Sequence, residues 1–454
     1  MPKLLIIGGS DAGISAALRA REINPGIEVA LMVADRYPNF SICGLPFYLS
    51  GEVSDWRTLA HRTADEITRQ GIRILMEHRA TRIDPAAKTV TAINKSGQTL
   101  VFEYEKLIIA TGAVSARPSL AGLDLPGVFT LRWMEDGFAI QRYMEEHHPK
   151  SAIILGAGYI GMEMADALTR KGLSVTLLVR SSHILKTLDP EMGEIIRKEL
   201  ECHGVHVIDQ LAVSAIEKRG KKLFIKNTRE IPVEGDMVLA ATGGRPETTI
   251  AETAGISTGI QGAIRVNRAM QTNIKDIYAA GDCVETWHRL LKKNTYLPLG
   301  TTAHKQGRVA GENAAGGKAE FAGSLGTQVV KIFDRVAART GFSGGEARDA
   351  GFDPLTNEQE TWDHKVYYPG ATPLRIRITG DRKTHRLLGA QIVGRYGAEV
   401  SKRIDIFASA LFNDMTVESL SQLDLSYTPP LGSPWDPVQM AAQHWAREAG
   451  KKKE

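Results

Sequence analysis

A strand–turn–helix–strand pattern with a glycine-rich turn occurs twice in this chain of 454 residues, and it constrains the fold more than any other feature. The first copy spans residues 3–34 with the turn Gly8–Gly13, and the second spans residues 151–179 with the turn Gly156–Gly161. Each turn follows an apolar run and opens a segment with helical periodicity. The internal repeat predicts an α/β fold with two Rossmann-like dinucleotide-binding domains and therefore two nucleotide sites.

Three later segments indicate where the chain passes between these domains. Strand-like runs end in threonine–glycine turns at Thr111-Gly112 and Thr242-Gly243, and the run Ile277–Asp282 returns to the first domain. From Gly326 the pattern becomes that of an α+β domain. The predicted domains are a discontinuous first domain over 1–147 and 272–322, a second over 148–271, and a third over 323–454. In the third, strands are predicted over 328–333, 375–379 and 387–394, and helices over 398–412 and 438–449.

The two glycine turns suit phosphate groups. Each turn precedes a helix, whose N-terminal N–H groups and dipole favour a pyrophosphate. The second turn carries the full Gly-x-Gly-x-x-Gly pattern, with Gly156, Gly158 and Gly161. The first carries Gly8 and Gly13 but has Ser10 in the middle position, where the backbone can still approach a phosphate and the hydroxyl can add a hydrogen bond.

The residue that ends the second strand of each unit indicates which nucleotide binds. In the second unit this strand ends at Val179-Arg180, so an acid that would hold a ribose 2′-hydroxyl is missing. Arg180 is instead placed to meet a 2′-phosphate, which favours NADPH over NADH. The alternative is that Arg180 is a solvated loop residue. In the first unit the corresponding position, Val33, is also apolar, and Asp35 is the nearest acid.

Cys43 follows the first glycine turn, in the run Phe40–Pro46, and no second cysteine lies nearby in the sequence. One sulfur must pair with a thiol from outside the chain or become a sulfenic acid. A helix N-terminus at 43–46 would lower the thiol pKa and expose it, whereas the alternative is a buried, inert cysteine. Cys202 and Cys283 are interpreted as structural residues.

Composition excludes several other classes of protein. The net charge is only +4, so nucleic acid is not an expected partner. Three cysteines do not make a disulfide scaffold. The sequence shows no signal peptide and no apolar run long enough to span a bilayer, which predicts a cytoplasmic protein without membrane association. No metal site is predicted.

These motifs together resemble a known family. Asp282, after Ala280-Gly281, is a carboxylate at a strand end that suits a ribityl hydroxyl. With Ser-x-Cys-Gly-Leu-Pro around Cys43 and the late run Tyr427–Pro430, the chain resembles the single-cysteine branch of the FAD-dependent pyridine nucleotide–disulfide reductases. That branch contains coenzyme A disulfide reductases, NAD(P)H oxidases and peroxidases, and persulfide or polysulfide reductases.

The resemblance implies roles for individual residues. Cys43 would be the redox-active thiol, Tyr159 would gate the flavin, and Glu163 would lie beside the nicotinamide. The partner subunit of a homodimer would contribute Tyr427 and one tyrosine of Tyr367-Tyr368. The cofactor-binding residues implied for FAD and NADPH (with NADH as the alternative) are Gly8, Ser10, Gly13, Asp35, Thr111, Gly112, Gly156, Gly158, Tyr159, Ile160, Gly161, Glu163, Arg180, Gly243, Gly281, Asp282 and Ala303.

Departures from the family pattern refine the expected function. Asp11 stands where oxidases and peroxidases of the branch carry a histidine, which counts against oxygen or peroxide as the main substrate. Asn39, Ile42 and Trp435 stand where coenzyme A reductases carry serine, asparagine and lysine, so a related but altered pocket is expected.

The expected activity follows from these motifs. It is electron transfer from NADPH through FAD and Cys43 to a small disulfide, coenzyme A disulfide or a related low-molecular-weight disulfide or persulfide. The alternatives are an NAD(P)H oxidase or peroxidase, a polysulfide reductase, and a non-catalytic redox-sensing flavoprotein.

Overall fold

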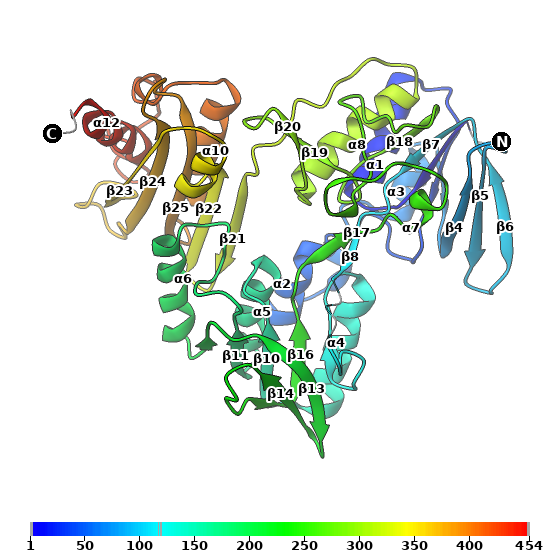
Figure 1. The fold of residues 1–454 in the computed structure, drawn as a ribbon, viewed down its shortest axis with the longest axis horizontal. Coiled ribbons are helices and arrows are strands. Elements are labelled where there is room, and N and C mark those ends of the chain that lie inside the picture. Colours follow the sequence, from blue (N-terminus) through cyan, green and yellow to red (C-terminus); the bar gives the residue numbers. More distant parts are fainter. Residues whose placement is uncertain (1–2, 117, 119, 452–454) are drawn as a thin grey trace. The chain divides into compact units, whose positions relative to one another are not determined.

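The computed structural model describes residues 3–116, 118 and 120–451 (Figure 1). The chain forms two units, each assembled from three stretches of sequence. The first unit comprises 1–116, 132–139 and 243–324, and the second comprises 117–131, 140–242 and 325–454. The division falls within helix α4 (Met134–His147). The two units are described separately.

A parallel five-stranded sheet forms the core of the first unit, in the order β18-β7-β1-β2-β3. Its strands are β1 (Leu4–Ile7), β2 (Val29–Met32), β3 (Ile72–Leu75), β7 (Lys106–Ile109) and β18 (Ile277–Ala279). Strands β1, β2 and β18 are buried along their whole length, as expected for parallel strands covered on both faces. This core confirms the first predicted dinucleotide-binding fold.

Helices α1 (Asp11–Ile23) and α8 (Gly300–Ala314) pack closely beside this sheet. A Cβ atom on Gly307 would lie 2.2 Å from the Ala12 carbonyl oxygen, and one on Gly311 would lie 2.1 Å from that of Ala16. Because any side chain at these two positions would collide with backbone, the glycines allow the two helices to touch. The N-terminus of α1 is thereby fixed against the middle of α8.

Smaller elements complete the first unit. An antiparallel sheet contains β4 (His78–Asp84), β5 (Thr89–Asn94) and β6 (Thr99–Glu103). Two short ribbons pair β8 (Ala113–Ser115) with β17 (Gly244–Pro246), and β19 (Thr286–His288) with β20 (Lys293–Thr295). The helices are α2 (Leu45–Ser50), α3 (Ala64–Arg69) and α7 (Thr249–Glu252), with 3-10 turns at Ile42–Gly44, Trp56–Leu59 and Ile260–Gly262.

The second unit contains the second predicted dinucleotide fold. Its parallel sheet has the order β12-β11-β10-β16-β9. The strands are β9 (Val128–Phe129), β10 (Ser151–Leu155), β11 (Ser174–Leu178), β12 (His206–Ile208) and β16 (Met237–Ala240), accompanied by helices α5 (Tyr159–Arg170) and α6 (Pro190–Cys202). A three-stranded antiparallel sheet contains β13 (Val213–Arg219), β14 (Lys222–Asn227) and β15 (Glu234–Gly235).

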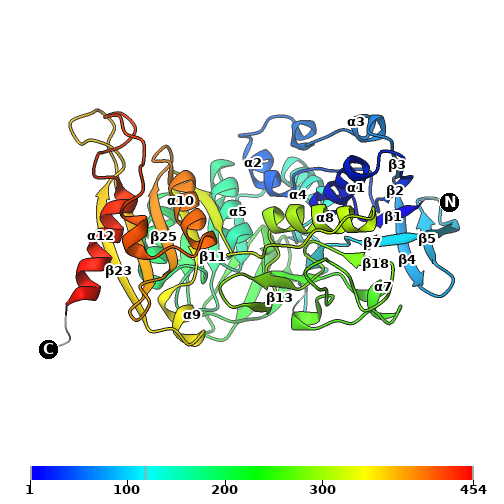
Figure 2. The ribbon, with the colours of Figure 1, turned by 90° about the horizontal axis from the view of Figure 1, so that it is seen from above.

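The C-terminal part of the second unit is α+β, as predicted. Its antiparallel sheet has the order β21-β22-β25-β24-β23, and helices α10 and α12 pack on it (Figure 2). The strands are β21 (Gln328–Ile332), β22 (Arg335–Gly341), β23 (Pro354–Trp362), β24 (Pro373–Asp381) and β25 (Leu387–Arg395). The helices are α9 (Gly344–Asp349), α10 (Val400–Phe412), α11 (Val417–Leu420) and α12 (Pro437–Gly450).

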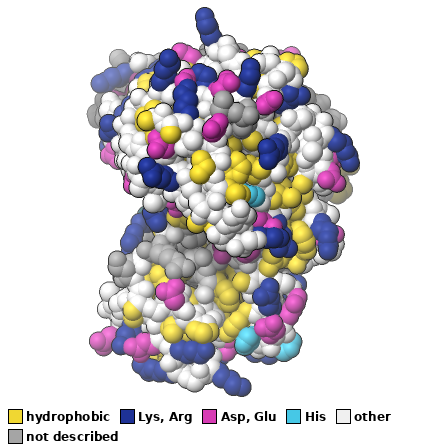
Figure 3. Space-filling view, turned by 90° about the vertical axis from the view of Figure 1, so that its right-hand side faces the viewer, with side chains coloured by type: hydrophobic (Ala, Val, Ile, Leu, Met, Phe, Trp, Pro, Cys, Tyr) yellow, Lys and Arg dark blue, Asp and Glu magenta, His cyan; other side chains and the backbone are white. Residues whose placement is uncertain are grey.

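Charged side chains of both signs are intermingled on the face drawn in Figure 3. This distribution agrees with the net charge of +4. In the part of the chain that the structure describes, no helix combines the length and apolar character needed to cross a membrane.

Candidate active site

The first glycine turn connects β1 to α1 and depends on two glycines. Gly8 has φ of +113°, and a Cβ there would lie 2.0 Å from the Ala110 carbonyl oxygen. A Cβ on Gly13 would lie 1.8 Å from the carbonyl oxygen of Gly8. Ser10 is exposed and is the N-cap residue of α1. Because the Ser10 side chain does not cap α1, the first-turn N–H groups of this helix form an N-terminus of the kind that suits a dinucleotide pyrophosphate.

Two further predicted residues lie at the ends of the neighbouring strands. Asp35 follows β2, accepts a hydrogen bond of 2.8 Å from the Tyr37 backbone N–H, and has a pKa raised by burial. Thr111 follows β7, and its hydroxyl donates to the Glu247 carbonyl oxygen at 2.5 Å. The carboxyl ends of parallel strands are where α/β folds bind ligands. Asp35, Thr111 and Gly112 therefore fit the predicted flavin site.

Asp282 follows β18 and forms an ion pair that the sequence did not predict. The Arg132 guanidinium donates to its carboxylate at 2.6 Å and to the Ala113 carbonyl oxygen at 3.1 Å. The Asp282 side chain remains 18% exposed, so its carboxylate is oriented by the arginine and still accessible. Beside it, Gly281 has φ of +90°, and a Cβ there would lie 2.8 Å from the Ala12 Cβ and 3.6 Å from that of Ala303.

Cys43 is exposed, as predicted. It lies in the 3-10 turn Ile42–Gly44, and α2 begins two residues later at Leu45. Leu45 is fully buried and fixes the start of this helix. A Cβ on Gly44 would lie 2.5 Å from the Leu59 side chain, so the turn packs closely against the neighbouring segment. Cys43 is thus held at a short turn on the surface of the first unit.

The other two cysteines differ from Cys43 and from each other. Cys283 is fully buried, and its S–H donates to the Ala280 carbonyl oxygen at 3.4 Å. Burial raises the pKa of the Cys283 thiol to about 11, so the thiol stays protonated at neutral pH. Cys202 is exposed, at the last residue of α6 in the second unit.

Two histidines that the sequence did not identify as site residues act electrostatically on Asp11. Burial raises the Asp11 pKa, while the charges of His61 and His304 lower it. The His304 ring bonds the Ser15 hydroxyl at 2.8 Å, one turn along α1 from Asp11. The backbone N–H of His61 donates to the Asn39 carbonyl oxygen at 2.9 Å, on the segment that leads to Cys43. Acid–base groups therefore gather at the start of α1 even though position 11 is not histidine.

The second glycine turn connects β10 to α5 with a similar geometry. A Cβ on Gly156 would lie 2.4 Å from the Ala241 carbonyl oxygen, and one on Gly161 would lie 2.0 Å from that of Gly156. Among the described residues, nothing lies within 4 Å of a Cβ built on Gly158. Gly156 and Gly161 thus allow close packing, whereas Gly158 opens the backbone to a ligand, as a pyrophosphate site requires.

Tyr159 and Ile160 begin α5 and are both partly exposed. The Tyr159 hydroxyl hydrogen bonds to the Thr187 hydroxyl at 3.1 Å, and burial raises its pKa. The Thr187 carbonyl oxygen accepts a hydrogen bond from the buried Arg339. The Tyr159 ring is therefore held in place by a chain of contacts within the second unit.

Glu163 lies one turn further along α5. Burial raises its pKa from 4.5 to about 7, and the nearby Asp166 carboxylate contributes. Asp166 itself is fixed by Arg170, at 2.5 Å, and by the backbone N–H of Phe333, at 2.8 Å. Glu163 is thus a carboxyl group able to exchange a proton near neutral pH.

This raised pKa predicts a pH-dependent stability. The folded state binds the Glu163 proton more tightly than the unfolded chain does. The contribution of Glu163 therefore lowers the free energy of unfolding as the pH rises from 4.5 to about 7. We expect Glu163→Gln to raise the thermal midpoint relative to the parent protein at about pH 8 and to do so less at about pH 5. Thermal unfolding across this range measures the difference, with exposed Glu194→Gln as control. A difference that is constant with pH would contradict the raised pKa.

Arg180 lies shortly after strand β11, and Gly243 lies shortly after strand β16. Arg180 is exposed and follows β11 directly after Val179. Gly243 belongs to the first unit, has φ of +101°, and accepts a hydrogen bond of 2.8 Å from the Ala116 N–H. Arg180 therefore belongs to the same unit as the second glycine turn, whereas Gly243 does not.

The predicted tyrosines lie on two loops of the second unit. Tyr367 and Tyr427 are 73% and 44% exposed, and the pKa of Tyr427 is raised by desolvation and by the neighbouring Tyr367 side chain. Tyr368 turns instead to the His364 ring, with centroids 5.8 Å apart. The structure therefore distinguishes the two neighbouring tyrosines and pairs Tyr367 with Tyr427.

A cluster of acidic and histidine side chains and a cavity also occur among the described residues. Glu199, His203 and Asp334 bring possible metal ligands within 4.8 Å of one another. Glu199, however, already accepts hydrogen bonds from the Asp334 N–H and from Arg335, each at 3.3 Å, so it serves to fix a turn.

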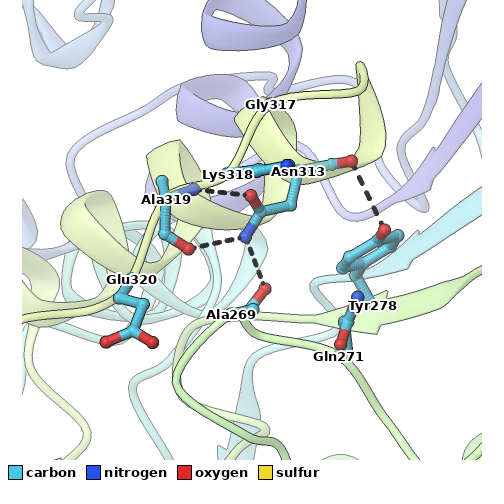
Figure 4. A pocket seen from close by; sticks show the side chains of 8 residues that line it. All are labelled: Ala269, Gln271, Tyr278, Asn313, Gly317, Lys318, Ala319 and Glu320. Carbon is cyan, nitrogen blue, oxygen red and sulfur yellow. Dashed lines mark hydrogen bonds between the residues drawn. The ribbon is translucent and has the colours of Figure 1, made fainter.

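The second feature is a cavity of about 270 Å³ in the first unit (Figure 4). The buried Asn313 side chain lies at its centre and hydrogen bonds to Ala269 and Ala319. The Tyr278 hydroxyl donates to the Asn313 carbonyl oxygen. The polar groups at this cavity hydrogen bond to one another. The cavity therefore has the features of a place where segments of the chain are held together, and not those of a ligand site.

Two nucleotide turns, each followed by parallel strands, and an exposed cysteine beside the first turn define a two-nucleotide oxidoreductase. Family comparison agrees with this geometry. The model of the pyridine nucleotide-disulphide oxidoreductases matches residues 2–307, and the model of their dimerisation domain matches residues 327–437. The chain belongs to this family and is an enzyme.

Individual relatives match almost the whole chain. It is 33% identical to the NAD(P)H sulfur oxidoreductase (CoA-dependent) of Pyrococcus furiosus, over 97% of this chain and 98% of the relative. It is 31% identical to the coenzyme A disulfide reductase of Staphylococcus haemolyticus, with coverage of 97% and 98%. An engineered NADPH oxidase, made from the NADH oxidase of Lactobacillus brevis and solved with NADPH, matches with a TM-score of 0.93, 26% identity and 98% coverage of both chains.

Proposed function

We propose that this enzyme uses NADPH to reduce a low-molecular-weight disulfide or persulfide through FAD and Cys43. The observation that carries the proposal is the exposure of Cys43 in the unit that holds the first glycine turn. The other cysteine of that unit, Cys283, is fully buried with a raised thiol pKa. Cys43 is therefore the thiol of this unit that a substrate sulfur can reach.

The chemistry of Cys43 follows from its position. Its thiolate attacks one sulfur of the substrate disulfide, a new S–S bond forms, and the other sulfur leaves as a thiolate. Bound FAD would supply two electrons from NADPH to the mixed disulfide, which then splits into the Cys43 thiolate and the second product thiolate. The departing thiolates take up protons from water and become the two product thiols.

The names of two relatives support a narrower class of substrate. One is named for coenzyme A disulfide reduction and another for coenzyme A-dependent sulfur reduction. Both names support a coenzyme A-containing disulfide or persulfide as the substrate of this chain.

Parallel turnover measurements test this function. NADPH oxidation would be followed with coenzyme A disulfide, with polysulfide in the presence of coenzyme A, and with oxygen alone. We expect the sulfur substrates to be reduced faster than oxygen. Turnover with oxygen that equals or exceeds turnover with both sulfur substrates would make the enzyme an oxidase and contradict the proposal.

NADPH is proposed as the electron donor because of the sequence after β11. In the engineered NADPH oxidase an aspartate was replaced, arginine and serine were introduced at the next two positions, and another arginine was introduced seven positions after the aspartate. In this chain Val179 is followed by Arg180 and Ser181, and the exposed Lys186 lies seven positions after Val179. The native chain thus already carries a cationic pattern of the kind introduced there.

Removal of the Arg180 charge should weaken NADPH selectively. A hydrogen bond between charged groups contributes about 1.5–3 kcal/mol, or roughly 10- to 100-fold. We expect Arg180→Ala to lower kcat/KM for NADPH by about this factor and to leave kcat/KM for NADH almost unchanged, because only NADPH carries the 2′-phosphate. Steady-state kinetics with both nucleotides measure this, with exposed Lys171→Ala as control. An equal loss for both nucleotides would refute the assignment.

The active form is proposed to be a homodimer whose third domain, over 323–454, presents Tyr367 and Tyr427 to Cys43 of the partner subunit. The match of residues 327–437 to a dimerisation-domain model supports this. The exposure of both hydroxyl-bearing rings supports it as well, because large exposed aromatic side chains are typical of interfaces.

A further inference from the structure

Arg403 is a buried arginine on α10 for which the function described so far has no use. Its side chain is 7% exposed, and its guanidinium donates to acceptors on three segments of the second unit. The contacts are the carbonyl oxygens of Asp363 at 2.6 Å, Ala398 at 3.2 Å and Leu431 at 3.4 Å, and the Asp436 carboxylate at 3.4 Å. A buried charge with four acceptors is fixed in place, since every contact compensates for lost water.

Two of these acceptors belong to the loops that carry the tyrosines. Asp363 begins the loop 363–372, which bears Tyr367, and Leu431 lies in the loop 421–436 between α11 and α12, which bears Tyr427. The loops also meet where the Lys365 N–H donates to the Pro429 carbonyl oxygen at 3.4 Å. Arg403 is therefore a charged side chain that joins the first loop, the second loop and α10.

The two acidic residues that contact Arg403, Asp363 and Asp436, are themselves held by hydrogen bonds to backbone N–H groups. The Asp363 carboxylate accepts hydrogen bonds from the backbone N–H groups of His364 and Thr372, each at 2.8 Å, and so closes the first loop. The Asp436 carboxylate accepts from the Val438 N–H at 2.8 Å and thereby caps α12. The tyrosines at the tips are exposed, so their separation depends on how the loop bases are held.

We propose that Arg403 is a positioning residue that fixes the Tyr367 and Tyr427 loops as one unit for presentation to the partner's Cys43. This role rests on the proposed function of the two tyrosines. An arginine suits it because the planar guanidinium spreads five donors over a rigid fork, whereas the lysine ammonium carries its three donors on one nitrogen. A displacement of about 1 Å at a catalytic group can cost roughly 100-fold in rate.

The first test compares Arg403→Met and Arg403→Lys with the exposed neighbour variant Lys402→Met. We expect Arg403→Met to lower kcat for disulfide reduction by about 100-fold, and Arg403→Lys by about 10-fold. NADPH-dependent reduction of ferricyanide, which needs no tyrosine, should stay within about two-fold in each variant. Disulfide turnover at the parent level in a folded, flavin-containing Arg403→Met protein would overturn the proposal. If that variant does not fold, parent-level turnover of Arg403→Lys would overturn it equally.

A second measurement separates positioning from general damage to the fold. If Arg403 acts through the tyrosines, its substitution adds little once Tyr427→Phe has removed the hydroxyl. We therefore expect the double variant Arg403→Met/Tyr427→Phe to be about as slow as the slower single variant, because residues that act as a unit are not additive. Fully multiplicative losses would show that Arg403 acts independently of Tyr427.

Mixed dimers distinguish failure of this proposal from failure of the proposed function. Pairing a Cys43→Ser subunit with an Arg403→Met subunit leaves one Cys43, which faces intact loops if the tyrosines act across the dimer. Pairing the parent subunit with a doubly substituted Cys43→Ser/Arg403→Met subunit leaves one Cys43 that faces damaged loops. Activity of only the first dimer supports both proposals. Activity of only the second places the tyrosines in the same subunit as their Cys43, and equal activity of both removes Arg403 from the mechanism.

Discussion

Replacement of Cys43 by serine should lower the turnover of sulfur substrates by at least about 1,000-fold. Electron transfer from NADPH to FAD should remain intact. A serine hydroxyl has nearly the same shape, but it is not ionised at neutral pH and forms no mixed disulfide. FAD binding and reduction by NADPH should persist, because the two glycine turns are separate from the 3-10 turn Ile42–Gly44. Anaerobic flavin reduction and steady-state turnover with coenzyme A disulfide measure the two steps separately.

Matched substitutions exist in the same chain. Cys283→Ser tests the buried thiol of the same unit, and Cys202→Ser tests the exposed thiol of the other unit. Turnover of the exposed Cys202 variant should remain near the parent level, and Cys283→Ser should affect stability rather than the chemistry of a folded enzyme. Normal disulfide reduction by Cys43→Ser would mean that the substrate is reduced without this sulfur, and the proposed mechanism would then be wrong.

The second large effect is expected at the first glycine turn. In Gly13→Ala the new Cβ would lie 1.8 Å from the Gly8 carbonyl oxygen, a contact that only a shift of the backbone can relieve. Because that shift moves the N–H groups at the start of α1, we expect the purified variant to retain less than about one tenth of the parent's flavin. The flavin absorbance per mole of protein measures this loss directly.

Gly26→Ala is a suitable control for this experiment. It lies in the turn after α1, and a Cβ there would be 3.5 Å from the Asn24 side chain, an ordinary contact. The control should purify with the parent's flavin content. Full flavin content in Gly13→Ala would show that FAD does not depend on this turn.

Features that are local in sequence could be predicted from it. The strand–turn–helix–strand copy predicted over 151–179 contains β10 (Ser151–Leu155), α5 (Tyr159–Arg170) and β11 (Ser174–Leu178). These elements follow from an apolar run, a glycine turn and helical periodicity that adjoin one another. The exposed position of Cys43 was predicted for the same reason, since the turn and α2 lie in one short segment.

Contacts between distant segments were missed. Arg132 pairs with Asp282 across 150 positions, and His304 reaches Ser15 across 289, so sequence spacing gives no signal for either. Strand β23 (Pro354–Trp362) was also missed, because its polar residues resemble a loop. It becomes a strand by pairing antiparallel with β24 and by packing against α12, whose buried Trp445 donates to the Leu355 carbonyl oxygen at 2.7 Å. Tertiary packing decides such segments.

The discontinuity of the first unit has a consequence for biosynthesis. Strand β18 pairs with β7, and helix α8 packs on α1, yet both belong to the last of the three stretches that build this unit. A ribosome that has made residues 1–116 has therefore released the apolar edge of β7 and one face of α1 without their cover. Domains fold as units during synthesis, so this unit closes only after residue 324 has emerged. Until then those surfaces stay uncovered, and the candidate flavin site, which includes Asp282, is completed only late in synthesis.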